Sequence, residues 1–221
     1  MHSHKDYIRQ TIKQQQRLLS KEQLAQWSLS VCQQLQQHPK IAACQTLLAY
    51  APLPSEVDIF PLIEHCRQAG KTVLLPRVEP RRQLSWHRYE GRQSLEEGAY
   101  RLLEPTTPAV CPLQTISPQT LTTGANPDAE ALVVLVPGLA FTPDGKRLGR
   151  GGGYYDRFLS AARQSTTTGK GTDPSDATSE CAPRSAQPRS LYTIGVCFPF
   201  QLIDHLPTEP HDEKIDEIVT P

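Results

Sequence analysis

Apolar residues recur along the chain at two spacings, which separate predicted helices from predicted strands. Residues 5–18 and 20–37 carry apolar side chains every three or four positions, as one face of a helix does. Ser20 and Gln23 match a capping box at the start of the second helix. Short continuous apolar runs instead predict buried strands, at residues 46–52, 72–78, 131–138, 191–198 and 215–221.

The order of these elements indicates an α/β fold with a mostly parallel sheet. A third amphipathic helix is expected over residues 58–69, between two buried strands, with Gly70 as its stop. Residues 83–90 alternate like a half-exposed strand, and residues 154–163 form a short predicted helix. The length suits one domain, residues 1–221.

Two segments contain few large apolar residues. Residues 104–130 are rich in Pro and Thr and are expected to be mostly loop. Residues 164–190 are of low complexity and cannot bury enough apolar surface to offset the entropy lost on ordering. We expect them to form a mobile surface insertion that activity does not need.

Composition limits the possible partners and the compartment. Lys plus Arg equals Asp plus Glu at 23 each, so no global field favours nucleic acid or an anionic membrane. The first residues lack the apolar core of a signal peptide, and no apolar run approaches the length of a membrane span. Six scattered cysteines argue against a zinc site or a disulfide framework and fit reduced thiols. These features predict a cytoplasmic globular protein.

Residues 147–156, RLGRGGGYYD, carry the clearest chemical signal. They follow the strongest predicted strand and lead into a helix, so bare backbone N–H groups and a helix N-terminus can face an anion together. Arg147 and Arg150 add guanidinium groups that suit phosphate oxygens. The pattern favours a phosphate cradle over a flexible turn that is merely glycine-rich. It is neither a Walker A loop nor a Rossmann fingerprint.

Several charged residues allow two interpretations from the sequence alone. Asp156 either complements the helix dipole or binds Mg²⁺ beside bound phosphates. Asp212 is either a second oxygen ligand or part of a solvated charged loop. Glu56 either caps the next helix or presents a carboxylate at a strand end, and Lys5 and Arg9 either reach a phosphate or form a solvated stripe. Tyr154 and Tyr155 are either core residues or stack on a flat ring.

The same residues resemble a known family. LVPGLAFTPDGKRLGRGGGYYDRFL, residues 135–159, is similar to the signature of the 5-formyltetrahydrofolate cyclo-ligases, also called 5,10-methenyltetrahydrofolate synthetases. Lys5 and Arg9, YAPLPSEVD at 50–58, GKTVLLPRV at 70–78 and EPHDEKIDEIVT at 209–220 occur in the order of that family. The resemblance covers nearly the whole chain except the 164–190 segment and the loop near 105–130.

The resemblance implies an ATP-dependent ligase of folate metabolism. Such an enzyme takes 5-formyltetrahydrofolate and MgATP to 5,10-methenyltetrahydrofolate, ADP and phosphate. The γ-phosphoryl group is transferred to the formyl oxygen, N10 attacks the activated carbon, and phosphate leaves. The implied fold is a three-layer α/β/α Rossmann-like domain, resembling sugar-phosphate isomerase and CoA-transferase folds, and we expect a monomer.

The resemblance also implies roles for individual residues. Gly152 departs from relatives that carry lysine there, so one cation of that site is missing. Two other functions are compatible with the same residues: a binding module without turnover, and a sugar-phosphate enzyme that does not use ATP. If ATP binding requires both Lys5 and Arg9, the sugar-phosphate enzyme is excluded. The implied catalytic residues are Arg147, Arg150 and Tyr154; the ATP-binding residues are Lys5, Arg9, Arg147, Leu148, Gly149, Arg150, Gly151, Gly152, Gly153, Tyr154 and Tyr155; the folate-binding residues are Ala51, Glu56, Arg150, Gly151, Gly152, Gly153 and Tyr154; and the Mg²⁺ ligands are Asp156 and Asp212.

Overall fold

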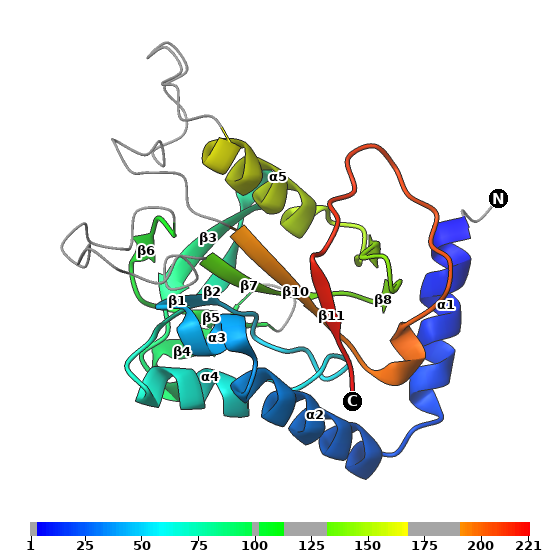
Figure 1. Cartoon of the computed structure of the whole chain (residues 1–221), viewed down its shortest axis with the longest axis horizontal. Helices are drawn as coiled ribbons and strands as arrows, with labels where there is room; N and C mark the ends of the chain where they lie inside the picture. Colours follow the sequence, from blue (N-terminus) through cyan, green and yellow to red (C-terminus); the bar gives the residue numbers. More distant parts are fainter. Residues whose placement is uncertain (1–3, 99–101, 113–131, 168–190) are drawn as a thin grey trace.

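The computed structural model of the protein describes residues 4–98, 102–112, 132–167 and 191–221. Within them lie five α-helices and eleven strands (Figure 1). The helices are α1 (His4–Arg17), α2 (Lys21–Gln36), α3 (Pro39–Ala43), α4 (Phe60–Gln68) and α5 (Tyr154–Thr167). The strands are β1 (Thr46–Leu48), β2 (Thr72–Glu79), β3 (Gln83–Arg88), β4 (Leu95–Glu97), β5 (Leu103–Pro105), β6 (Ala109–Val110), β7 (Leu132–Pro137), β8 (Ala140–Phe141), β9 (Arg147–Leu148), β10 (Leu191–Val196) and β11 (Glu217–Val219).

A mixed seven-stranded sheet forms the centre, in the order β11-β10-β7-β1-β2-β3-β6. The first five strands of that order run parallel, and β3 and β6 extend the sheet in antiparallel fashion. The chain goes from β1 to β2 on one side and returns to β7 on the other. The carboxyl ends of β1 and β7 therefore meet where the strand order reverses, which is where open α/β sheets bind ligands.

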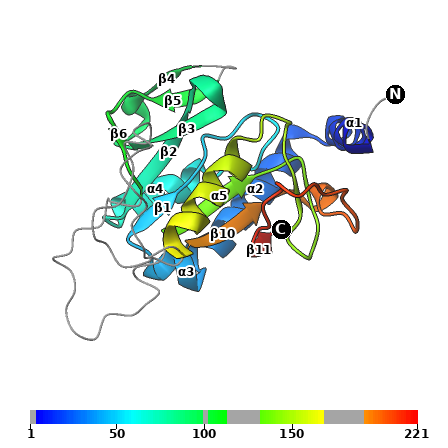
Figure 2. The same cartoon turned by 90° about the horizontal axis from the view of Figure 1, so that it is seen from above.

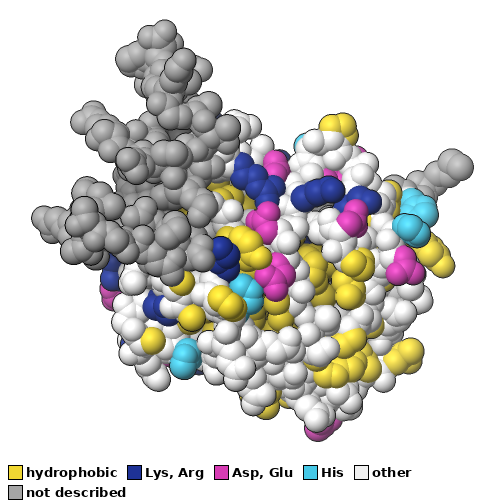
Figure 3. Space-filling view, in the orientation of Figure 1, with side chains coloured by type: hydrophobic (Ala, Val, Ile, Leu, Met, Phe, Trp, Pro, Cys, Tyr) yellow, Lys and Arg dark blue, Asp and Glu magenta, His cyan; other side chains and the backbone are white. Residues whose placement is uncertain are grey.

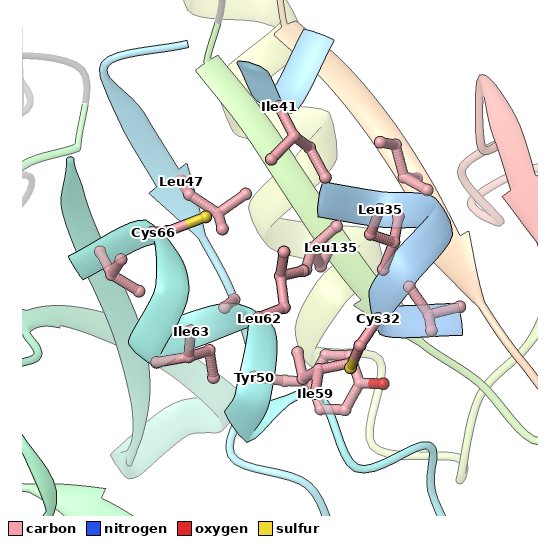
Figure 4. Close-up of a cluster of buried hydrophobic side chains, with 14 of the residues drawn as sticks. Cys32, Leu35, Ile41, Leu47, Tyr50, Ile59, Leu62, Ile63, Cys66 and Leu135 are labelled. Atoms are coloured by element: carbon pink, nitrogen blue, oxygen red, sulfur yellow. The ribbon is translucent and has the colours of Figure 1, made fainter. Parts of the chain in front are cut away.

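Alternating side chains of the buried strands serve two cores, one on each face of the sheet. In β7, Val133 and Leu135 face the core beneath α2 and α4, whereas Val134 and Val136 face the core beneath α5. Figure 4 shows the first core, where Leu35 of α2 approaches the sheet. This burial on both faces explains why the parallel strands are apolar throughout.

Helix α1 is set apart from this packing and lies beyond the carboxyl ends of the parallel strands (Figures 1 and 2). Its buried residues Ile8 and Ile12 form a smaller cluster with Ala140 of β8, Leu148 of β9 and Leu206. The apolar stripe of α1 thus docks the helix so that its first turns border the end of the sheet.

The elements expected from the sequence are confirmed, with corrections at their ends. Helix α5 continues through Thr167, so the segment predicted to be an insertion from 164 begins as helix; residues 168–190 lie outside the described residues. The loop expected at 104–130 contains β6 and the end of β5, and its residues 113–130 also lie outside the described part. Helix α3 was not expected, because five residues are too few to carry a periodic pattern.

The cysteine expectation needs one correction. Within the part of the chain that the structure describes, Cys32, Cys44, Cys66 and Cys197 are free and buried, which agrees with the expectation of reduced thiols, but Cys111 is disulfide-bonded. The described helices include none with the length and apolar character needed to cross a membrane. On the face drawn in Figure 3, acidic and basic side chains lie next to one another, in keeping with their equal numbers.

Candidate active site

A cavity of about 910 Å³ opens at the reversal point of the sheet. Its walls come from α1, the turn after β1, the β2–β3 hairpin, the glycine segment between β9 and α5, and the turn at 209–212. Every residue expected at the site lines it: Lys5, Arg9, Ala51, Glu56, Arg147, Leu148, Gly149, Arg150, Gly151, Gly152, Gly153, Tyr154, Tyr155, Asp156 and Asp212.

Arg147 and Asp156 form a nearly buried ion pair in the wall. Strand β9 places Arg147 with a side chain only 5% exposed, and its Nη2 donates to Oδ1 of Asp156 at 2.8 Å. Nη1 donates to the carbonyl of Pro137 at 3.3 Å, while Nε has no hydrogen-bond partner among the described residues. A buried guanidinium without its counter-charge is costly, so each residue of the pair fixes the other. Arg147 thereby orients the carboxylate of Asp156.

The turn at 209–212 carries a second acidic group. Lys5 Nζ lies 2.9 Å from Oδ2 of Asp212 and 3.4 Å from Oε1 of Glu209. Partial burial raises the pKa of Asp212, but the hydrogen bonds from Lys5 and from the Glu209 N–H outweigh burial and hold this pKa below its usual value. The ligand atoms of Glu209, His211 and Asp212 all lie within 4.8 Å of one another. The turn therefore offers clustered oxygen and nitrogen ligands beside the Lys5 ammonium.

Helix α5 fixes this turn relative to Asp156. Nη1 of Arg163 donates to Oε2 of Glu213 at 2.5 Å, and its Nη2 donates to the carbonyl of Lys214 at 2.7 Å. The Glu213 N–H also reaches Oδ1 of Asp156 at 3.4 Å. Because Asp156 and Arg163 both belong to α5, one helix anchors the turn that carries Asp212 and presents the second carboxylate.

Arg9 lies over the glycine segment. Its Nε donates to the carbonyl of Gly149 at 3.2 Å, and its Nη1 donates to Asp6 at 2.7 Å. Gly151 has a φ of +100°, a conformation that glycine adopts at little cost, and a Cβ added there would lie 3.8 Å from the Arg9 guanidinium. Arg9 is thus brought to the glycine segment and Lys5 to the turn at 209–212, and the structure pairs both with acidic side chains.

Glu56 and Arg150 contact each other across the cavity. Nη2 and Nε of Arg150 both donate to Oε1 of Glu56, at 3.1 and 3.2 Å, and Nη2 also reaches Oγ of Ser55 at 2.7 Å. Oε2 of Glu56 accepts from the N–H of Leu53 within its own turn. Asp58, not Glu56, supplies the side-chain hydrogen bond at the start of α4. The capping interpretation of Glu56 is therefore wrong, and its carboxylate faces the cavity.

The two tyrosines of the motif differ in their surroundings. Burial, followed by the nearby Glu56 charge, raises the pKa of Tyr155, and its hydroxyl has no hydrogen-bond partner among the described residues. Its ring centroid lies 5.8 Å from the Arg147 guanidinium carbon. The ring of Tyr154 lies against Gly152, where a Cβ would come within 2.5 Å of it. Both rings therefore belong to the packed wall as well as to the cavity surface.

Sequence reasoning missed several cavity residues. No spacing motif marks His211 in the sequence, because its side chain comes together with those of Glu209 and Asp212 only in the folded turn. Arg82 and Leu84 reach the cavity through the β2–β3 hairpin, and no motif marks them. Alternation in residues 83–90 places Leu84 and Trp86 on one face, but only the packed fold tells which face borders the cavity.

Comparison with known proteins agrees with this geometry. The model of the 5-formyltetrahydrofolate cyclo-ligase family matches residues 1–174 and 167–221. The chain belongs to the 5-formyltetrahydrofolate cyclo-ligase family. It is 27% identical over 214 residues to the 5-formyltetrahydrofolate cyclo-ligase of Escherichia coli K12, covering 95% of this chain and 96% of that protein. It is 31% identical over 182 residues to that of Mycolicibacterium smegmatis, covering 80% and 74%.

Solved structures of the family have the same fold. The NMR structure of 5,10-methenyltetrahydrofolate synthetase from Aquifex aeolicus aligns with a TM-score of 0.68 and 26% identity, over 98% of this chain and 89% of that one. Membership makes this chain an ATP-dependent ligase of folate and one-carbon metabolism that converts 5-formyltetrahydrofolate to 5,10-methenyltetrahydrofolate.

Proposed function

We propose that the cavity binds ATP, Mg²⁺ and 5-formyltetrahydrofolate together and closes the folate ring by phosphorylating the formyl oxygen. The observation that carries this proposal is the convergence on one cavity of a cationic glycine segment, two cations of α1 and carboxylates on two sides. Phosphoryl transfer depends mainly on positioning and on stabilising charge, and this set of groups supplies both.

The chemistry follows from the poor leaving ability of a formamide oxygen. We propose that this oxygen attacks the γ-phosphorus, ADP leaves, and an iminium phosphate forms on N5. N10 then adds to the formyl carbon and loses its proton, and the C–O bond breaks with release of phosphate. The carbon keeps its bonds to N5 and N10 in 5,10-methenyltetrahydrofolate. Because water would hydrolyse the activated formyl group, this sequence of steps requires the bound substrates to exclude water from the cavity.

Residue roles are proposed from position. Lys5, Arg9 and Arg150 lie where they can contact the ATP phosphates, together with the N–H groups of Gly151–Gly153. Glu56 can accept hydrogen bonds from the aminopyrimidine edge of the pterin, because a carboxylate oxygen that accepts from Arg150 retains further acceptor capacity. Arg147 acts through Asp156, which it orients. In the same proposal, Tyr154 and Tyr155 pack against the bound substrates, Ala51 borders the folate, and Leu148 and Gly149 shape the nucleotide loop.

The carboxylates fit Mg²⁺. Asp156 and Asp212 are the oxygen donors that this ion prefers, and both lie beside the proposed phosphate site. When bound, Mg²⁺ would neutralise charge that develops on the phosphoryl oxygens. Lys5 and Arg147 already compensate the two carboxylates, so their charges and positions are set by the chain itself.

We also propose that residues 1–221 form a single domain of the three-layer Rossmann-like kind found in sugar-phosphate isomerases and CoA-transferases. The protein is proposed to be a monomer and to be located in the cytoplasm. The layers are supported by cores on both faces of the sheet. The segment 168–190, outside the described residues, is proposed to be a dispensable surface insertion. Deleting it should leave activity intact; a folded but inactive deletion variant would contradict this.

The proposed reaction is tested by following the near-ultraviolet absorbance of the methenyl product. Purified protein is mixed with 5-formyltetrahydrofolate and MgATP, and parallel reactions omit ATP or Mg²⁺. A rise that needs both, with one ADP formed for each product molecule, supports the proposal. A flat trace from folded protein that binds ATP would contradict it.

The metal role of Asp156 is tested separately. Asp156→Asn should weaken Mn²⁺ binding, measured by electron paramagnetic resonance in the presence of a non-hydrolysable ATP analogue, and lower kcat. The change also leaves the buried Arg147 charge unpaired, so we expect a loss of about 3 kcal/mol in unfolding free energy. The variant Asp156→Asn with Arg147→Met restores stability but not metal binding. Unchanged Mn²⁺ affinity in both variants would exclude the metal role.

A further inference from the structure

Arg150 is turned away from the task that its place in the chain suggests. It lies in the glycine segment, where the proposed function places the ATP phosphates, yet its guanidinium contacts Glu56. Nε and Nη2 form one forked edge of a guanidinium, and phosphate oxygens bind to such an edge in the same geometry. In the structure this edge is on Oε1 of Glu56, at 3.2 and 3.1 Å. Phosphate binding through it therefore requires the Arg150–Glu56 pair to open.

Glu56 is the fixed partner of this pair. Its N–H donates to the carbonyl of Leu53 at 2.9 Å, and its Oε2 accepts from the Leu53 N–H at 3.1 Å. The side chain of Glu56 is only 10% exposed, whereas that of Arg150 is 41% exposed. Arg150 also has Gly149 and Gly151 on either side, which allow its backbone a wide range of conformations. Opening the pair is therefore a movement of Arg150.

Opening the pair leaves the Glu56 carboxylate in need of other hydrogen-bond donors. A carboxylate with little access to water is costly to leave without a counter-charge or hydrogen bonds. The aminopyrimidine edge that the proposed function places at Glu56 supplies such donors. In turn, phosphates that attract Arg150 stabilise the open pair before the pterin arrives. Each ligand thus favours the state that the other one needs, and such a coupling is reciprocal.

Ser55 provides a second contact that holds Arg150 in the closed pair. Its Oγ accepts from Nη2 of Arg150 at 2.7 Å, which is shorter than either bond from Arg150 to Glu56. Ser55 precedes Glu56 in the same turn but lies outside the cavity lining. It can therefore stabilise the closed pair without contacting either ligand.

We propose that Ser55 is a positioning residue that holds Arg150 on Glu56 until a ligand binds, and that opening of this pair couples ATP binding to folate binding. In the ligand-free protein, the closed pair lowers the affinity for each ligand in proportion to the fraction of molecules in which the pair is open. The first ligand opens the pair, so the second binds with its full affinity. This inference rests on the proposed function, which places phosphate at Arg150 and pterin at Glu56.

Isothermal titration calorimetry tests the coupling without turnover. The ligands are 5-formyltetrahydrofolate and the β,γ-imido analogue of ATP with Mg²⁺, each titrated alone and with the other at saturation. In wild type, each should bind about tenfold more tightly when the other is bound, by the same factor in both directions. Ser55→Ala should bind each ligand alone about threefold more tightly, because the closed pair loses one bond of a partly exposed guanidinium. Its affinity for the second ligand should equal that of wild type, so the coupling falls to about threefold.

Two further variants separate this role from a merely structural one. Ser55→Thr keeps the hydroxyl and should match wild type. Ser160→Ala removes a hydroxyl that accepts from Gln164 within α5, outside the cavity lining, and should also match wild type. If Ser55→Ala weakened the binding of single ligands, or left the coupling at its wild-type value, the inference would be overturned. Wild type that binds both ligands without coupling would refute the inference alone, whereas wild type that binds neither would refute the proposed function as well.

Discussion

Gly152 lies against the ring of Tyr154, so the conformation of one residue depends on the absence of a side chain at the other. A Cβ at position 152 would lie 2.5 and 2.6 Å from two ring carbons of Tyr154, distances that real Cβ atoms do not show. The missing cation and the position of the Tyr154 ring are therefore linked features of this chain.

Gly152→Ala should consequently act through Tyr154. We expect the alanine variant to displace the ring and to lower kcat/KM about tenfold, with an unfolding temperature close to wild type because the ring can move. In a Tyr154→Ala background the same change should have almost no further effect, since the ring is gone. Gly70→Ala is the control: Gly70 lies outside the cavity lining, and its φ of +81° predicts a loss of about 1 kcal/mol in stability instead. Additive kinetic effects of Gly152→Ala and Tyr154→Ala would show that the contact does not matter.

At the scale of elements, the short edge strand β11 depends on side-chain contacts as well as on its pairing with β10. Oε2 of Glu217 accepts from the hydroxyl of Tyr192 at 2.8 Å and lies 3.0 Å from Nε2 of His38. Burial raises the pKa of Glu217, but the hydrogen bonds from Tyr192 and His38 outweigh burial and the pKa is lowered. Burial and the bond to Glu217 raise the pKa of Tyr192 to about 12. The contact therefore stabilises β11 only between two pH limits.

The sign of each limit follows from the direction of the pKa shift. Because the pKa of Glu217 is lowered, its carboxylate stabilises the folded protein at pH values above the ordinary carboxyl pKa of 4.5. This stabilisation is lost as the pH falls through the lowered pKa. A raised phenol pKa contributes stability below 10, and this is lost as pH rises towards 12. Tyr192→Phe should thus be less stable than wild type at pH 7, and the difference should shrink below pH 4.5 and above pH 10. Unfolding temperatures of both proteins across this range test it. A difference that does not change with pH would contradict the assignment.

An element or contact could be predicted from the sequence where the residues that determine it lie close together in the chain. The start of α2 was predictable because Ser20 accepts from the N–H of Gln23 only three residues away. The partner of Glu56 was not, because Arg150 is 94 residues distant and meets it only after the sheet forms. The glycine segment could be singled out because its residues are adjacent in the sequence, and the structure places them in the cavity lining. Arg82 and Leu84 of the β2–β3 hairpin were missed because packing decides which face of the hairpin borders the cavity.

At the scale of the whole molecule, the two faces of the sheet share the same strands and should unfold together. Cys32, Cys44 and Cys66 lie in the core beneath α2 and α4, and Cys197 lies in the core beneath α5. Burial raises the pKa of Cys32 and Cys44 to about 11 and that of Cys197 to about 12, so these thiols are protonated near neutral pH. All four are at most 2% exposed. Thiol reagents should therefore reach them only after the protein opens.

Labelling of the native protein at pH 8 provides the measurement. A thiol reagent is added over a series of low denaturant concentrations, and modification at each site is followed by peptide mass spectrometry. We expect one common rate for the four cysteines, with a dependence on denaturant equal to that of global unfolding, because strands such as β7 contribute alternate residues to both cores. A Ser28→Ala variant is a sensitive control, since it removes the hydrogen bond that the N–H of Asp58, beside Cys32, donates to Oγ of Ser28, and it should raise all four rates equally. Faster labelling of Cys197 alone would mean that the layer containing α5 opens independently, and the two cores would then be separate cooperative units.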